Sequence, residues 1–337
     1  MQNKLLYLSW LPPFSRSDKI SDYEAECKPV VWDEKRIRSL DGTKLAVCEG
    51  RIPASEDRKP ASSRKKSVVI CYFQGNGGST PLRLPLLSHF LRTISAKSKS
   101  ISSLDQTDYT VVALSYRGYW KSSGSANQSG IELDAQAFLA WVANTYSAPD
   151  TDLQIVLWGH SLGSAVASSV LSKYLSRQAS EQNATSTNLP SISGLILEAP
   201  ISNIKDMLIS LYPQKWLPYR YLWPFSWNTW CTATALEQLA DWRNQNESLT
   251  RRDSDYLSGA HGESPSVPPI FILSAENDEV IPPIVAGQLE KKGQELGLYI
   301  SRKDVPGAMH TEGPMKNDGR EALVNFILRN TASDRDK

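Results

Sequence analysis

Residues 152–167 read DLQIVLWGHSLGSAVA, and this stretch decides the fold. The apolar run 153–158 is typical of a strand buried on both faces of a parallel sheet, and the small residues at its end are typical of a helix. Between them lies GHSLG at 159–163, a G-x-S-x-G pattern. Its two glycines let neighbouring chain pass close by without a clash with a Cβ atom. The stretch therefore predicts a tight strand-to-helix turn with Ser161 at its tip.

Further apolar runs on both sides of this stretch alternate with helical patterns. The runs predict strands at 67–73, 109–115, 194–198, 270–274 and 298–305, and the patterns predict helices at 131–145, 162–175, 284–296 and 320–329. Two more runs, 30–38 and 45–52, flank Asp41-Gly42, which is a hairpin signal. The predicted fold class is α/β, with a mostly parallel central sheet, an N-terminal antiparallel hairpin and helices on both faces.

Charge and cysteine content exclude several classes of function. The chain has 337 residues, 37 Lys and Arg against 36 Asp and Glu, and a formal net charge of +1. Since it lacks the positive excess of nucleic-acid-binding proteins, we expect no nucleic acid as a partner. Its cysteines are scattered and form no C-x-x-C pair, so the sequence predicts neither a metal site nor a disulfide framework: Cys27, Cys48, Cys71 and Cys231. We expect no cofactor.

A serine on such a turn is typical of a nucleophile, which needs a base to take its proton. In this arrangement an acid and then a histidine follow the serine along the chain. Two histidines, His261 and His310, come after Ser161. His261 precedes the last two predicted strands, whereas His310 follows both, so we predict His310 as the base. Adjacent side chains on the turn point apart, so we interpret His160 as structural.

The acid is expected in a loop at the carboxyl end of a strand. Asp278 lies in such a loop, where it would orient His310 and stabilise the protonated imidazole. Glu276 and Glu279 are weaker candidates, which we interpret as solvated. Glu198 ends another predicted strand and stays an alternative acid, because this position holds the acid in some proteins of this fold.

The segment QGNGG at 74–78 follows the predicted strand 67–73. Its glycines allow the backbone to approach a reacting centre closely. We predict that the backbone N–H groups of Asn76 and Leu162 form an oxyanion hole, the second at the positive end of a helix. A glycine-rich loop can also bind phosphate, but the chain lacks the G-x-x-x-x-G-K-[ST] pattern of nucleotide sites.

Several short motifs follow one another over residues 30–329, nearly the whole chain: GNGG, YRGY, SSGS, WGHSLGSAVA, LILEAPISNI and AENDEVIPP. Together they resemble the α/β-hydrolase domain-containing serine hydrolases, in particular the lysophosphatidylserine and monoacylglycerol lipase branch. The resemblance implies an α/β-hydrolase fold with nucleophile Ser161, acid Asp278 and base His310. Family members usually carry histidine where this chain has Gln74, so we expect altered hydrogen bonding in that loop and retained activity.

Two apolar segments lie outside the predicted sheet. The run LLYLSWLPPF at 5–14 is too short to span a membrane, so residues 1–29 are either an apolar strap on the domain or an abbreviated anchor. Residues 30–331 are predicted to form a single domain with a small cap insertion at about 202–262. Within it, 207–230 is rich in Trp, Tyr and Pro. These aromatics either pack on the core, line an acyl-chain pocket or face a membrane surface.

The sequence predicts a serine hydrolase that cleaves carboxylic esters through an acyl-enzyme. The resemblance narrows this to a monoacylglycerol or lysophospholipid lipase acting on acyl lipids, located at a membrane such as the endoplasmic reticulum or in the cytoplasm. Two alternatives stay open: a protein depalmitoylase and a non-catalytic scaffold that keeps the fold. Depalmitoylase relatives often carry a cysteine cluster at the N-terminus, whereas only Cys27 precedes Cys48 here.

Overall fold

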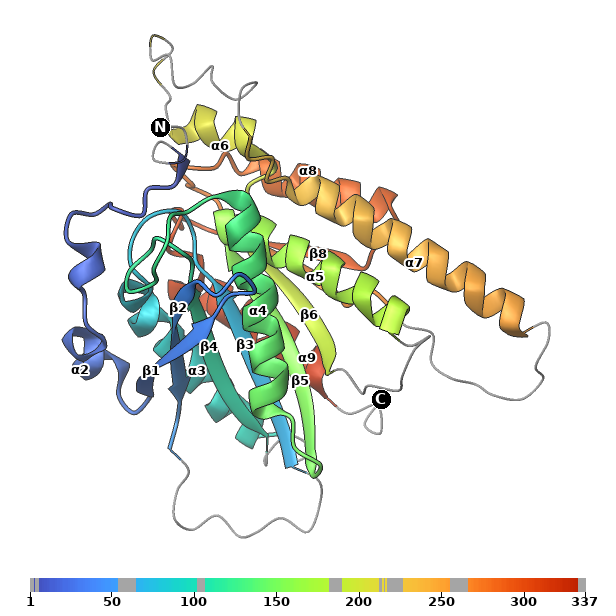
Figure 1. Cartoon of the computed structure of the whole chain (residues 1–337), viewed down its shortest axis with the longest axis horizontal. Helices are drawn as coiled ribbons and strands as arrows, with labels where there is room; N and C mark the ends of the chain where they lie inside the picture. The colour runs from blue at the N-terminus through green and yellow to red at the C-terminus, as the bar shows by residue number, and fades with distance from the viewer. Residues whose placement is uncertain are drawn as a thin grey trace.

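The computed structural model describes residues 3, 6–53, 65–101, 107–181, 190–211, 214, 216, 227–254 and 266–332. Its centre is an eight-stranded sheet in the order β1-β2-β4-β3-β5-β6-β7-β8 (Figure 1). The first three strands in this order pair antiparallel, and all the others pair parallel. The strands are β1 (Val31–Arg38), β2 (Lys44–Arg51), β3 (Lys65–Phe73), β4 (Asp108–Ser115), β5 (Thr151–His160), β6 (Ser191–Glu198), β7 (Ile270–Ala275) and β8 (Ile300–Val305). This topology confirms the predicted sheet and its N-terminal hairpin.

The hairpin between β1 and β2 turns at the predicted dipeptide. Gly42 has a φ of +85°, a backbone conformation that favours glycine. The N–H of Thr43 donates to the Asp41 carboxylate at 3.1 Å, and the N–H of Ser39 donates to the carbonyl of Thr43 at 2.8 Å. The turn therefore sets the register in which Arg38 pairs with Lys44 and Val31 pairs with Arg51.

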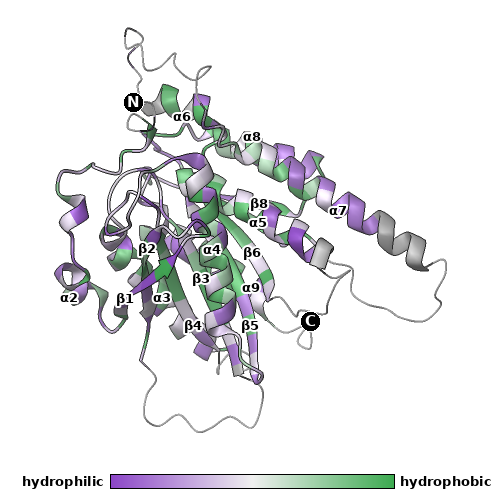
Figure 2. Cartoon of the chain, in the orientation of Figure 1, coloured by the Kyte–Doolittle hydropathy of each residue, from purple (hydrophilic) through white to green (hydrophobic). Residues whose placement is uncertain are grey.

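Helices cover both faces of the sheet, as predicted (Figure 1). One face packs on α4 (Gln128–Tyr146), α5 (Leu162–Glu181), α7 (Thr232–Ser254) and α8 (Ile284–Glu295). The other packs on α3 (Leu84–Lys99) and α9 (Asn317–Thr331). Figure 2 shows the apolar residues concentrated on the strands and on the inner sides of these helices. Each fully buried aliphatic side chain in the two cores contributes about 1.5–3 kcal/mol by leaving water.

Helix α3 was not among the predicted helices. Its buried residues recur at helical spacing: Leu84, Leu87, Phe90, Leu91 and Ile94. The helix continues through a polar last turn to Lys99, so it includes the first part of a Ser- and Lys-rich stretch of sequence. Tertiary packing against α9 and β4 supplies the stability that a helix of this length lacks in isolation.

The predicted cap insertion lies between β6 and β7. Its described parts are α6 (Ile204–Leu211), residues 214, 216 and 227–231, and α7, which runs out beyond the edge of the sheet (Figure 1). Most of the aromatic run 207–230 lies outside the described residues, as does His261. Trp230 and Trp242 are buried in the core. Among the described residues, no helix has the length and apolar character needed to cross a membrane.

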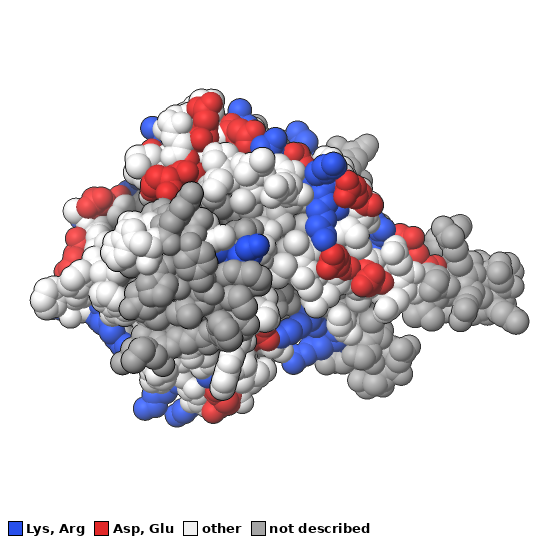
Figure 3. All heavy atoms as spheres, turned by 90° about the horizontal axis from the view of Figure 1, so that it is seen from above, with Lys and Arg blue, Asp and Glu red and all other residues white. Residues whose placement is uncertain are grey.

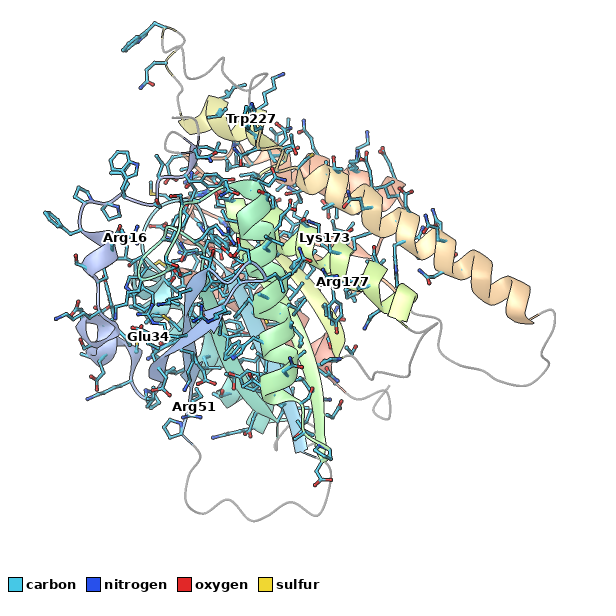
Figure 4. The ribbon with its side chains drawn as sticks, viewed as in Figure 1. Arg16, Glu34, Arg51, Lys173, Arg177 and Trp227 are labelled. Atoms are coloured by element: carbon cyan, nitrogen blue, oxygen red, sulfur yellow. The ribbon has the colours of Figure 1, made fainter. Side chains whose placement is uncertain are left out.

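The N-terminal segment, defined here as residues 6–18, packs against the domain. Leu6 and Tyr7 are 2% and 1% exposed. The Tyr7 hydroxyl donates to Asn228 at 2.8 Å and accepts from the Trp230 indole N–H at 2.9 Å, so it joins the start of the chain to the insertion. At the other end of the segment, Arg16 donates to backbone carbonyls of the loop after β4 at 3.0 and 3.1 Å (Figure 4).

Candidate active site

Ser161 occupies the predicted turn between β5 and α5. Its φ is +53°, a left-handed conformation that costs a non-glycine residue about 1–3 kcal/mol and that clusters at functional sites. The turn is held by a hydrogen bond from the N–H of Ser161 to the carbonyl of Glu198 at 2.8 Å. Gly159 lies where an added Cβ would meet the Gly163 carbonyl oxygen at 2.2 Å, so the chain crosses itself closely here. The serine side chain is thus fixed at the carboxyl edge of the sheet.

Asp278 and His310 meet across two loops at the same edge. Asp278 follows β7 and His310 follows β8. The imidazole Nδ1 lies 2.8 Å from Oδ2 of Asp278 and 3.0 Å from Oδ1. Their side chains are 3% and 8% exposed, so the contact is shielded from water. A carboxylate at this nitrogen requires Nδ1 to carry a proton, which leaves Nε2 as the ring nitrogen able to accept one.

The neighbouring carboxylates hold the two loops together. The exposed Glu279 accepts from the backbone N–H of His310 at 2.9 Å, and the exposed Glu276 accepts from Gly307 at 2.8 Å. From the sequence, both side chains were interpreted as solvated. Each is exposed and also accepts a hydrogen bond from the loop that follows β8. The main chain reinforces them, since the N–H of Asn277 donates to the carbonyl of Ala308 at 2.9 Å. The position of His310 relative to β7 is therefore fixed at several points.

The predicted oxyanion loop follows β3. Gly77 and Gly78 adopt φ values of +83° and +72°, and Leu162 begins α5 beside the loop. The Asn76 side chain turns away to the N-terminal segment. It donates to the carbonyl of Leu6 at 2.6 Å and accepts from the N–H of Leu8 at 2.9 Å. No local sequence pattern indicates this contact, because it joins residues 68 and 70 positions apart.

Gln74 opens the same loop in place of the histidine that the resemblance led us to expect. Its side-chain oxygen accepts from the hydroxyl of Thr80 at 2.6 Å, and its backbone oxygen accepts from the hydroxyl of Tyr116 at 2.9 Å. Its Nε2 is buried and has no partner in the part of the chain that the structure describes. The loop is thus held chiefly through oxygen acceptors at this residue.

His160 lies between the loop that follows β3 and the loop that follows β8 and carries His310. Its ring centroid is 5.0 Å from that of His310, and its Nε2 lies 3.3 Å from the carbonyl oxygen of His310. Since a carbonyl only accepts, Nε2 carries the proton. Burial, with the nearby cation of Arg83, lowers the pKa of His160 well below its usual 6.5. His160 is therefore a neutral hydrogen-bond donor in the folded protein.

This pKa predicts how stability depends on pH. Above pH 6.5, His160 is neutral in both the folded and unfolded states and contributes no pH dependence. Below it, the unfolded chain binds a proton that the folded chain excludes, so the free energy of unfolding falls as pH falls. We expect His160→Gln to remove about 1–2 kcal/mol of the loss between pH 6.5 and 5, measured by urea denaturation.

A matched control for this prediction is His89→Gln on α3. His89 is exposed, and its pKa is lowered chiefly by partial burial. Its replacement should leave most of the pH dependence in place. An unchanged pH dependence in the His160→Gln protein would contradict the assignment of His160 as buried and neutral.

Glu198, the alternative acid, is engaged elsewhere. Its carboxylate, 1% exposed, accepts from Arg83 Nη2 at 2.8 Å and from the indole N–H of Trp158 at 2.9 Å. Burial raises the pKa of Glu198, and the charge of Arg83 acts against that rise. The structure thus brings Asp278, and not Glu198, to the Nδ1 of His310. Arg83 was not predicted, because nothing in its local sequence marks it.

No group of three or more His, Cys, Asp or Glu side chains within the described ranges is arranged to hold a metal ion.

Figure 3 shows the molecule from above, with Lys and Arg interspersed with Asp and Glu over the described surface. Neither sign gathers into an extended patch there. Near the site, Asp278, Glu198 and Arg83 carry largely buried charges, and Glu276 and Glu279 carry exposed ones.

Comparison with known proteins identifies the family. The sequence profile of the alpha/beta hydrolase family matches residues 83–325, which is well over half of the chain. Protein bem46 of Schizosaccharomyces pombe is 26% identical over 333 residues, covering 98% of this chain and 86% of the relative. Lysophosphatidylserine lipase ABHD12 of Xenopus tropicalis is 28% identical over 214 residues, covering 64% of this chain. The chain spans less than half of that lipase, 44% of its length.

Solved structures share the fold at low sequence identity. An alpha-beta hydrolase from Vibrio vulnificus matches with a TM-score of 0.62 at 14% identity, covering 96% of this chain and 91% of the other. The esterase Pf2001 of Pyrococcus furiosus matches with a TM-score of 0.55 at 15% identity, with 93% of each chain covered. These likenesses show the fold, and the profile match over residues 83–325 shows that the chain belongs to the alpha/beta hydrolase family.

Proposed function

We propose that this protein is a serine hydrolase that cleaves carboxylic esters, with Ser161 as the nucleophile. The observation that carries the proposal is the Asp278–His310 contact of 2.8 Å at the edge of the sheet where the Ser161 turn lies. Three loops, after β5, β7 and β8, supply one group each. A structural ion pair would not need a strained serine at the same edge of the sheet.

In the proposed reaction, the Ser161 oxygen attacks the ester carbonyl and its proton passes to Nε2 of His310. The protonated imidazole is stabilised by Asp278 and returns the proton to the departing alcohol. The backbone N–H groups of Asn76 and Leu162 stabilise the negative oxygen of the tetrahedral intermediate. Water, activated in the same way, then cleaves the acyl-enzyme to a free acid and restores the serine.

For the substrate, we propose an acyl lipid of the monoacylglycerol or lysophospholipid class. Support comes from the relative named as a lysophosphatidylserine lipase and from exposed aromatic side chains in the N-terminal segment and next to its contact with the domain. Trp10, Phe14 and Trp227 are 55%, 85% and 92% exposed, and Trp227 lies next to the residue that binds Tyr7 (Figure 4). Aromatic side chains of this kind favour a lipid–water boundary, where such substrates reside.

Fluorophosphonate labelling tests the proposal. We expect the wild-type protein to label and Ser161→Ala not to label. The matched control is Ser168→Ala, which removes a buried hydroxyl about two turns along α5 from Ser161 and should label normally. Block of labelling by monoacylglycerol or lysophospholipid supports the lipase, whereas block by a palmitoyl-cysteine thioester alone favours the depalmitoylase. A wild-type protein that does not label would overturn the proposal in favour of a scaffold.

A further inference from the structure

Arg83 makes a hydrogen bond with each of three different parts of the molecule. It ends η3 (Thr80–Arg83), directly after the oxyanion loop, and its side chain is only 16% exposed. Its Nε donates to the hydroxyl of Tyr72 at 2.8 Å, Nη1 donates to the carbonyl of Thr311 at 3.2 Å, and Nη2 donates to Glu198 at 2.8 Å. A planar guanidinium with fixed donors suits such a three-way junction, and the single ammonium of lysine does not.

These bonds connect the loops that carry the proposed catalytic groups. Glu198 receives the backbone N–H of Ser161 on its carbonyl and the guanidinium of Arg83 on its carboxylate. Arg83 in turn binds the residue next to His310. A continuous chain of hydrogen bonds therefore runs from the nucleophile turn, through the end of β6 and η3, to the histidine loop.

We propose that Arg83 and Glu198 form a positioning pair for this reaction. The pair fixes the distance between the loops that carry Ser161 and His310, and the opposite charges of its two members offset each other near His310. The inference rests on the proposed function. It assigns neither residue a contact with substrate. The pair acts through Ser161 and His310, and Tyr72 and Trp158 orient it from within the core.

The charge part of the proposal concerns protonation of His310. The groups that face it from the surrounding elements are Asp278 and Glu279 after β7, Glu312 in its own loop, His160 at the end of β5, Arg83 in η3 and Glu198 on β6. With both members of the pair present, their effects on a positive imidazole oppose each other. Glu198→Gln leaves the Arg83 cation uncompensated, which disfavours the protonated imidazole.

Two variants separate the geometric effect from the charge effect. Arg83→Lys keeps the charge but cannot span the three acceptors, so we expect kcat to fall about 10- to 100-fold with KM within threefold. The pH at which kcat/KM declines on the acid side should stay in place. Glu198→Gln removes the charge, so that acid-side decline should move to lower pH by about 0.5–1 unit.

The controls use an ion pair away from the site, in which Arg302 contacts Glu290 at 2.8 Å. Arg302→Lys and Glu290→Gln should match the wild type in kcat and in pH profile. Melting curves establish that each variant is folded; if Glu198→Gln does not fold, kcat of Arg83→Lys decides. The pair is merely structural if folded Arg83→Lys retains kcat within twofold and any folded Glu198→Gln keeps the pH profile. Failure of the proposed function can be told apart from failure of this inference, because the wild-type protein itself would then be inactive.

Discussion

Asp278→Asn is expected to lower kcat/KM on a carboxylic ester by about 10³- to 10⁴-fold with little change in folding. Asp278 Oδ1 accepts the backbone N–H groups of Val280 and Ile281 at 2.9 and 2.6 Å, and an asparagine carbonyl can keep both bonds. The amide nitrogen then faces Nδ1 of His310. Because that nitrogen only donates, Nδ1 must lose its proton, and Nε2 gains one.

The wrong tautomer leaves His310 without a free nitrogen to accept the Ser161 proton. Steady-state kinetics on a short-chain ester measure the loss, and a thermal melt verifies the fold. Glu276→Gln is the control, because this exposed side chain in the same loop accepts a hydrogen bond from the N–H of Gly307, and a glutamine oxygen can keep that bond. It should change kcat/KM less than threefold. A loss below tenfold in Asp278→Asn would contradict the role of Asp278.

Gly163→Ala is the substitution expected to damage the fold most. A Cβ atom at this position would lie 2.0 Å from the carbonyl oxygen of Phe73 and 2.7 Å from that of Gln74. Both are backbone atoms at the end of a central strand, so neither can rotate away. We expect a loss of about 4 kcal/mol or more in the free energy of unfolding, since α5 must move away from β3.

Thermal unfolding measures this loss, which for a chain of 337 residues corresponds to a fall in melting temperature of about 6 °C or more. Gly287→Ala on α8 is the control, because its nearest neighbour to an added Cβ is the Arg302 guanidinium at 3.7 Å. Alanine there should stabilise the helix by about 0.5–1 kcal/mol. If Gly163→Ala melted within 2 °C of the wild type, the close packing of α5 on β3 would be wrong.

The sheet was predictable because its information is local. Continuous apolar runs such as β5 and β7 are typical of strands buried on both faces of a parallel sheet, and the GHSLG turn fixes how β5 leads into α5. Helix α3 carries an equally clear apolar spacing, but its polar last turn resembles the neighbouring Ser- and Lys-rich sequence. Its length is set by packing against α9, which sequence periodicity does not contain.

The residues of the candidate site also fall into two groups, those that the local sequence predicts and those that it does not. Asp278 and His310 could be chosen from their places after predicted strands, because the carboxyl ends of parallel strands share one edge. Arg83 could not, since its three acceptors lie 11, 115 and 228 residues away. Likewise, the glycines around Asn76 indicated a close-approach loop, but the use of its side chain depends on where the N-terminal segment docks.

The contacts of Tyr7 bear on the order in which the chain can fold during synthesis. Its hydroxyl bonds to Asn228 and Trp230, which are made 221 and 223 residues later. At about 5–20 residues per second, the ribosome needs about 11–45 s to add that much chain. Through that time the Tyr7 hydroxyl lacks both of these partners. The N-terminal segment therefore cannot complete its docking until synthesis has reached Trp230.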